Sequence, residues 1–187
     1  MTISLKEEYK NTLEGKLTLP AMKDDIPIIC VNDFADMKKI THVYFEPGNR
    51  YTLIGMPGVN TGAFSRNNYD VPVLKAVYLP HSIRYIGENC FINQYNLEDA
   101  NLDALEILEV ISTNAFRKGG SRFSEPDMKM KCTKLADTIT TIGGGAFYSG
   151  GPNIIIESLP ANLITLGDWA FYGCSGLKIT EFGSDSG

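Results

Sequence analysis

The 187 residues include 22 acidic and 17 basic side chains, and 43 % are hydrophobic, which is ordinary for a folded domain. The net charge of −5 argues against the clustered basic surface of a nucleic-acid-binding protein. The sequence has no apolar run long enough to predict a membrane span, and its first residues lack the basic start and apolar centre of a secretion signal.

Residues 4–14 have the pattern of a short helix. Ser4 and Glu7 have the spacing of a capping box, and an apolar stripe follows at Leu5, Tyr9 and Leu13. Gly15 is a suitable C-terminal stop. Because a stack of repeats exposes the apolar face of its first member, we predict that residues 1–15 form an N-terminal capping helix.

Six phenylalanines mark a repeated unit along the rest of the chain: Phe34, Phe64, Phe91, Phe116, Phe147 and Phe171. Five residues before each of them the chain is always apolar, at Ile29, Val59, Ile86, Ile111, Ile142 and Leu166. Eight residues before, it is again always apolar, at Ile26, Met56, Ile83, Leu108, Ile139 and Leu163. Units this short cannot bury their apolar residues alone, so the pattern predicts coils that stack column on column.

A second apolar pattern follows each of several phenylalanines and ends in strict alternation. Its members are Ile40/Val43/Phe45, Leu74/Val77/Leu79, Leu97/Ala100/Leu102 and Leu177/Thr180/Phe182. Alternation predicts a short strand with one buried face. Three stretches rich in Gly, Pro, Asn or Ser, at Glu46–Tyr51, Ser65–Pro72 and Arg117–Asp127, are expected to be inserted surface loops.

The four cysteines, Cys30, Cys90, Cys132 and Cys174, contain no closely spaced pair of the kind that zinc sites use. Cys90 precedes Phe91 at a position where Ala63, Ala115, Ala146 and Ala170 precede their phenylalanines. Packing in the core therefore explains Cys90 and Cys174 better than metal binding, while two disulfides remain the alternative.

Catalytic constellations are not evident. His42 and His81 have no serine, cysteine or aspartate at an interpretable spacing, and Gly143–Gly145 lacks the lysine of a phosphate-binding loop. Asp24 and Asp25 are expected to be solvated loop residues. We therefore expect no enzymatic activity, no cofactor and no metal.

The alternate residues of each strand point away from the core and form the candidate partner-binding surface. They are His42, Tyr44, Tyr78, Asp99, Asn101 and Glu181, with Cys132 and Lys134 at the equivalent places in the coil that carries the longest insertion. Tyr44 and Tyr78 are expected on neighbouring strands about 5 Å apart. Exposed tyrosines are efficient interface anchors, but cross-strand packing that covers the sheet is the favoured explanation of the pair.

Two stretches resemble the repeat LPxxIxxIGxxAFxxCxxLxxIxI of the BspA-like (Treponema-type) leucine-rich repeats. They read LPHSIRYIGENCFINQYNLEDANL at 79–102 and LPANLITLGDWAFYGCSGLKITEF at 159–182. The resemblance implies a leucine-rich-repeat solenoid of about six coils over residues 16–182, followed by a flexible tail at 183–187. It also implies a right-handed curved superhelix, mainly β with short helical turns, with a short parallel strand per coil on its concave face. The first two copies depart from the pattern, with Cys30 and Asn60 where glycine is expected.

Proteins of this family are mostly bacterial, at the cell surface or secreted, and some adhere to host matrix proteins or to cells. The resemblance therefore implies a non-catalytic protein-binding or adhesion module that uses the concave sheet and the inserted loops. The alternative is a structural or assembly component of a larger surface protein or particle. Such a component would dock, or associate with itself, through the uncapped coil that ends near Phe182.

Overall fold

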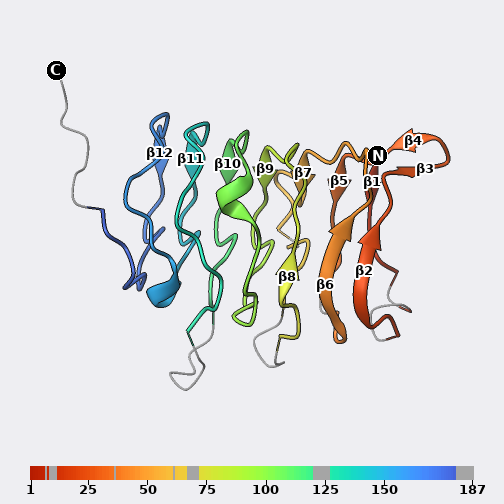
Figure 1. Ribbon diagram of the computed structural model, residues 1–187, viewed down its shortest axis with the longest axis horizontal. Helices are drawn as coiled ribbons and strands as arrows, with labels where there is room; N and C mark the ends of the chain where they lie inside the picture. The colour runs from red at the N-terminus through yellow and green to blue at the C-terminus, as the bar shows by residue number, and fades with distance from the viewer. Residues whose placement is uncertain are drawn as a thin grey trace.

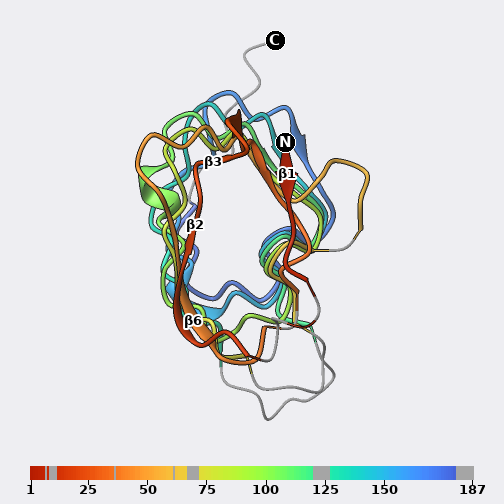
Figure 2. The same cartoon turned by 90° about the vertical axis from the view of Figure 1, so that its right-hand side faces the viewer.

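The computed structural model describes residues 1–6, 8, 12–35, 37–60, 62–66, 72–119 and 127–179. Over these residues the chain winds as a row of stacked coils, whose N- and C-terminal coils lie at opposite ends of the row (Figure 1). Viewed along the row, the coils overlay in one closed outline with a wall on each side (Figure 2). Below, coils 1 to 6 are the turns that contain Phe34, Phe64, Phe91, Phe116, Phe147 and Phe171.

The first wall is an unbroken parallel sheet of seven two-residue strands in the order β1-β5-β7-β9-β10-β11-β12. The strands are β1 (Thr2–Ile3), β5 (Cys30–Val31), β7 (Leu53–Ile54), β9 (Tyr85–Ile86), β10 (Val110–Ile111), β11 (Thr141–Ile142) and β12 (Thr165–Leu166). The IxxIG part of each repeat thus forms a strand of its own. This differs from the expectation of one strand per coil, because the two residues before the glycine are too short a run to show alternation.

The second wall carries the strands predicted from the LxxVxL pattern, but only its first part is a sheet. The strands β2 (Gly15–Leu19), β6 (Ile40–Phe45) and β8 (Ala76–Val77) pair in parallel. Beyond β8 the pairing is reduced to isolated bridges, Ala76 with Asp99 and Cys132 with Ile154. The hairpin β3 (Met22–Lys23) and β4 (Ile26–Pro27) and two short 3-10 turns, η1 (Leu102–Ala104) and η2 (Gly151–Asn153), complete the described elements.

The phenylalanines form a continuous ladder through the interior, as predicted. Ring centroids of successive members are 5.0 to 5.8 Å apart, and from Phe64 onward the rings are stacked nearly parallel. Phe64, Phe91, Phe116 and Phe147 are fully buried. Each ring covers the next, so no coil could bury its own ring alone.

The two apolar columns predicted before the phenylalanines are correct in coils 3 to 6 and wrong in coils 1 and 2. Strand pairing aligns Val31 and Ile54 with Ile86, in place of Ile29 and Val59. The second column runs through Ile28 and Tyr51, both fully buried, whereas the predicted members Ile26 and Met56 are exposed. The link from strand to phenylalanine is shorter in coil 1 and longer in coil 2 than in the others, so counting back from the ring fails there.

The observed strand pairing also shows which glycine of coil 2 takes the glycine position of the repeat pattern. Gly55, directly after β7, occupies the position that Gly87 takes after β9, and its φ is +81°. Counting back from Phe64 predicted that Asn60 takes the glycine position of coil 2. Asn60 instead lies in the longer link between Gly55 and the ring.

The N-terminal segment begins as a strand. β1 pairs with β5, so the first wall starts before residue 16, and Leu5 and Leu13 pack against the core. Gly15 is the first residue of β2 rather than the end of a helix. Glu7 and residues 9–11, the centre of the predicted capping helix, lie outside the described residues, as does the tail at 183–187. The described residues include no helix long and apolar enough to cross a membrane.

Candidate functional site

Four side chains on β2, β6 and β8 form an aromatic patch on the outside of the second wall: Lys16, His42, Tyr44 and Tyr78. The Tyr44 and Tyr78 rings stack with centroids 4.9 Å apart and planes 17° apart. The His42 ring lies 6.4 Å from Tyr44, and the Lys16 ammonium lies 5.9 Å from the centre of the Tyr44 ring. Stacking covers the ring faces, so the patch offers ring edges, hydroxyls and one cation to a partner.

A register shift between β2 and β6 brings these side chains to one face. Gly15 pairs with Ile40 and Lys16 with His42, so one residue of β6 is left over at Thr41. The Thr41 hydroxyl donates to the Gly15 carbonyl at 3.0 Å and lies 2.9 Å from His42 Nδ1. Because the hydroxyl has one proton, Nδ1 of His42 must donate to Thr41, and this contact holds the imidazole ring in place.

Tyr78 is the most exposed aromatic ring of the patch, with 40 % of its surface accessible. Desolvation raises the pKa of its hydroxyl, and the neighbouring Tyr44 and Asp99 raise that pKa further. The Tyr78 hydroxyl therefore stays protonated at neutral and mildly alkaline pH and remains a hydrogen-bond donor.

Asp99 and Asn101, also predicted for this surface, have different roles. Asn101 adopts a left-handed backbone with φ 38°. Its side-chain amide donates to the Leu79 carbonyl at 3.0 Å, and its oxygen accepts from the Leu79 N–H at 2.7 Å. Asn101 therefore clamps coil 3 to the preceding coil, whereas the exposed Asp99 carboxylate accepts from the Asn101 N–H at 2.6 Å.

The prediction that Cys132 points outward is wrong. Its side chain is fully buried, and Lys131 and Thr133 on either side are exposed. The insertion after Phe116 changes the number of residues between the ring and the second wall, so the position equivalent to those of the other coils cannot be assigned there by counting. Lys134 is exposed as predicted, and Glu181 lies outside the described residues.

Shallow hollows follow the second wall from the end of the sheet toward coil 5. The largest, of about 610 Å³, is lined by Glu98, Asp99, Asn101, Leu102, Asp103, Lys129, Lys131 and Asn153. Glu98 and Lys129 also line a hollow on the side of β6, and Asp103 lines one that reaches Lys134. Acidic side chains thus come mainly from coil 3 and lysines from coil 4, where the regular sheet has ended.

The cysteines and His81 are accounted for by packing and hydrogen bonding. All four cysteines are free and buried, which confirms the packing interpretation of Cys90 and Cys174. Burial raises the pKa of Cys90 to about 12 and that of Cys174 to about 11, so both remain thiols. His81 Nδ1 donates to the Ala104 carbonyl at 3.0 Å. Within the described part of the chain, no three His, Cys, Asp or Glu side chains are grouped to hold a metal ion.

Sequence comparison identifies the repeats. The family model of the BspA type leucine rich repeat region matches residues 7–125 and 123–186, in six copies. The chain belongs to this family. Among solved structures, the BspA-type chain is similar to a leucine-rich repeat protein from Eubacterium ventriosum, with 17 % sequence identity and a TM-score of 0.47. The similarity covers 90 % of this chain and 44 % of that protein, so the chain spans less than half of its length. The comparison with curated proteins found no match to the chain.

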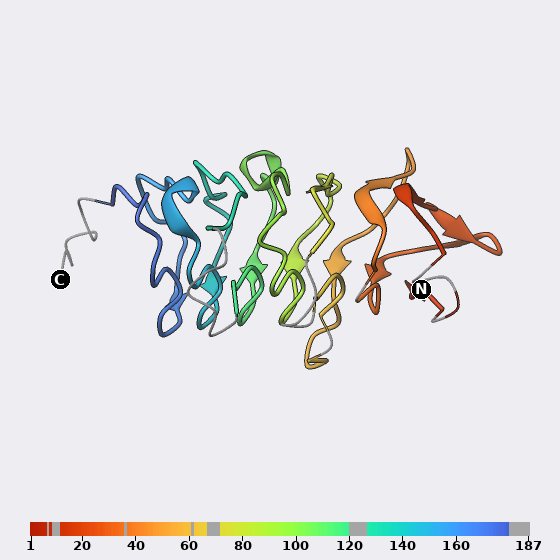
Figure 3. The same cartoon turned by 90° about the horizontal axis from the view of Figure 1, so that it is seen from below.

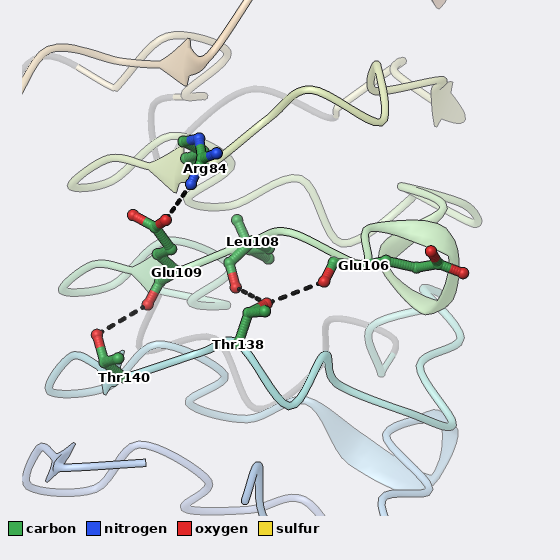
Figure 4. A network of polar contacts seen from close by, with 6 residues as sticks. All are labelled: Arg84, Glu106, Leu108, Glu109, Thr138 and Thr140. Carbon is green, nitrogen blue, oxygen red and sulfur yellow. Dashed lines mark hydrogen bonds and ion pairs between the residues drawn. The ribbon is translucent and has the colours of Figure 1, made fainter. Parts of the chain in front are cut away.

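The sequence reasoning missed Lys16 and a polar column on the first wall of this BspA-type protein. Lys16 was missed because β2 was not expected so close to the N-terminus. In the column, the Arg84 guanidinium pairs with the Glu109 carboxylate, and Thr140 Oγ donates to the Glu109 carbonyl at 3.3 Å (Figure 4). Aligning the IxxIG segments of successive coils in the sequence would have identified these residues. They occupy the same position in neighbouring coils and bond to one another from coil to coil.

One more polar contact of the first wall lies beside this column. The Thr138 hydroxyl lies 2.7 Å from the Leu108 carbonyl and 3.0 Å from the Glu106 carbonyl (Figure 4). These partners belong to the preceding coil. The polar groups of the first wall therefore help to hold the BspA-type coils together.

Proposed function

We propose that this protein is a non-catalytic protein-binding module whose contact surface is the aromatic patch with the adjoining hollows. The stacked pair of Tyr44 and Tyr78 is the observation that carries the proposal. Their rings are held by each other and by the sheet, so a partner would lose little side-chain entropy in contacting them. Protein interaction is also the general role of leucine-rich repeats.

The hollows extend the proposed surface beyond the tyrosines. Asp99 and the lysines of coil 4 lie on the same wall and provide charges that could select a partner by electrostatic complementarity. By family resemblance, we expect the solenoid to curve with this wall on its concave side. By family resemblance, we propose a host matrix or cell-surface protein as the partner, and adhesion at the bacterial surface as the setting. Parts of the loops Ser65–Pro72 and Arg117–Asp127 lie outside the described residues, and their contribution stays a prediction.

The test is a double variant, Tyr44→Ala with Tyr78→Ala, measured against immobilised host matrix proteins. We expect at least ~10-fold weaker binding, as for paired aromatic anchors. Loss of an aromatic pair at a partly exposed site should cost about 1 kcal/mol of folding stability, or roughly 2–4 °C in melting temperature.

The matched control is Arg84→Ala with Glu109→Ala, which removes an exposed pair from the first wall and should leave binding unchanged. If the tyrosine variant instead loses several kcal/mol of stability while binding is unaffected, the pair only covers the sheet.

A second candidate function is assembly through coil 6. The exposure of apolar side chains on that coil favours it, since Ile164 is 84 % and Trp169 is 73 % accessible. Isolated exposed apolar residues are common, but several large ones gathered on one coil are typical of a contact surface.

A further inference from the structure

The largest hollow of the second wall holds opposite charges that do not pair with one another. Elsewhere, charges on neighbouring turns of the chain form ion pairs, which are Glu14 with Lys39, Arg84 with Glu109, and Glu157 with Lys178. The hollow is lined by Glu98 and Asp99 from coil 3 and by Lys129 and Lys131 from coil 4, and all four side chains are exposed. Within the described part of the chain, no ion pair involves any of them. Two carboxylates and two ammonium groups are therefore free to bind charges of a partner.

Three other residues that line the hollow are fixed by hydrogen bonds to a neighbouring coil. The Asp103 carboxylate accepts from the Thr133 N–H at 3.0 Å and from the Thr133 hydroxyl at 2.6 Å. The Asn153 amide donates to the Met128 carbonyl at 2.9 Å, and Asn101 is the clamp described above. The turns η1 and η2, which contain Asp103 and Asn153, lie on one side of the row with coil 4 between them (Figure 3). The hollow is therefore held in shape before a ligand arrives, which lowers the entropy lost on binding.

The charges follow one another along the row of coils, beside the aromatic patch. Asp99 bridges Ala76 of coil 2, and Tyr78 comes two residues after Ala76. The Lys131 N–H donates to the Glu98 carbonyl at 3.3 Å, so the lysine backbone lies one strand spacing, about 5 Å, beyond the carboxylates. The order along the row is thus aromatic ring, carboxylates, lysines. An extended peptide has side chains on one face about 6.6 Å apart, which suits this spacing when the side chains are long.

We propose that this hollow binds an extended segment of a protein partner in which a basic and an acidic side chain stand two residues apart. The basic side chain would reach Glu98 and Asp99, and the acidic side chain would reach Lys129 and Lys131. A segment with charges of one sign would be attracted by one coil and repelled by the next. This inference rests on the proposed function and names the chemistry of the partner segment.

The experiment measures the binding of short synthetic peptides to the full chain by fluorescence anisotropy. One peptide carries arginine and aspartate in turn at every second position, with serine between them. Two others of the same length carry only arginine or only aspartate at those positions. The mixed-charge peptide should bind at least ~10-fold more tightly than either of the others, and added salt should weaken its binding.

Charge reversals on the protein should change this preference in opposite directions. Lys131→Glu should shift it at least ~10-fold toward the arginine peptide, and Glu98→Lys should shift it toward the aspartate peptide. Lys131→Arg should behave as wild type. The control Lys23→Glu makes the same charge change on the exposed β3–β4 hairpin at the N-terminal end (Figure 1) and should leave the preference unchanged. The substituted side chains are all exposed, so unchanged melting temperatures would show that the variants are folded.

Two results would overturn the inference. One is that the mixed-charge peptide does not bind, or binds no better than the others. The other is a shift in Lys23→Glu as large as that in Lys131→Glu, which would show that only the net charge of the chain matters. If the tyrosine variant loses matrix-protein binding while the peptides bind equally, the inference fails and the proposed function stands. If Lys131→Glu shifts the peptide preference but no matrix protein binds, the inference is supported and only the proposed partner is wrong.

Discussion

The two walls of the solenoid are made by the same repeats but differ in regularity. The first wall continues strand after strand from β1 to β12, and its outward polar groups bond between coils. The second wall is a sheet only as far as β8, continues as isolated bridges, and bears the aromatic patch and the hollows. The aromatic patch lies on the paired strands of the second wall, and the hollows lie where that pairing is reduced to isolated bridges.

The walls also differ in the lengths of the links that lead to them. The stretch from the IxxIG strand to the phenylalanine has a constant length in coils 3 to 6, so β9 to β12 stay in register. The links that lead to the second wall vary in length, most strongly after Phe64 and Phe116. Link length alone does not decide where the second sheet ends, because β8 follows the long link after Phe64 and still pairs with β6. Four predictions test the interior and the two walls in turn.

The largest effect should come from the interior ladder that both walls enclose. Phe147→Ala removes a fully buried ring stacked on Phe116 and Phe171, and we expect a loss of about 3–5 kcal/mol in urea unfolding. Phe171→Ala is the matched comparison, because that ring is only partly buried, and its cost should be clearly smaller. Equal costs would contradict a ladder whose members depend on neighbours on both sides.

Glycine at the turn after the first wall should be the next most sensitive position. A Cβ on Gly55 would approach Cys90 Sγ to 2.7 Å, at a φ of +81°. Gly55→Ala should therefore cost about 2–3 kcal/mol, by strain and overpacking together. Gly48→Ala, at a φ of +72° with no atom within 4 Å, should cost only about 1 kcal/mol. Chemical denaturation of both variants would separate strain from crowding, and equal losses would contradict crowding at Gly55.

A clamp of the second wall should be weaker but measurable. Asn101→Ala removes both side-chain hydrogen bonds to Leu79 and should cost about 1–3 kcal/mol. Asp99→Ala, beside it and exposed, should cost less in stability and act mainly on partner affinity. If Asp99→Ala instead lowers stability more than Asn101→Ala in thermal unfolding, Asn101 would again be a candidate partner contact.

The smallest effect concerns pH. Burial raises the pKa of the Cys90 thiol from 9.0 to about 12. Below pH 9 the folded and unfolded chains both keep the proton, and the full stability is present. As the pH rises from 9 toward 12, only the unfolded chain releases it, so stability falls, by about 1 kcal/mol near pH 10. Urea unfolding on both sides of pH 9 should show a shallower decline in Cys90→Ala than in wild type. Identical slopes would contradict a buried neutral thiol.

Prediction from the sequence succeeded where the repeat has constant length. The phenylalanine ladder and the columns of coils 3 to 6 followed from counting, and so did the outward direction of Tyr44 and Tyr78 beside each other. It failed at Ile29, Met56 and Val59, and at Cys132, where the link to the phenylalanine is shorter or longer than in the other coils. Counting assumes a fixed length between two points, and no local property of these residues signals the change.

The sequence by itself determined that this protein is a stack of coils, because apolar side chains at repeated spacing cannot be buried within one coil. It also determined most of the residues that face the interior. Only the tertiary structure decided which residues pair across neighbouring coils, since backbone pairing joins segments about one repeat apart and absorbs insertions between them. That pairing placed Lys16 beside Tyr44 and gave Asn101 to the clamp.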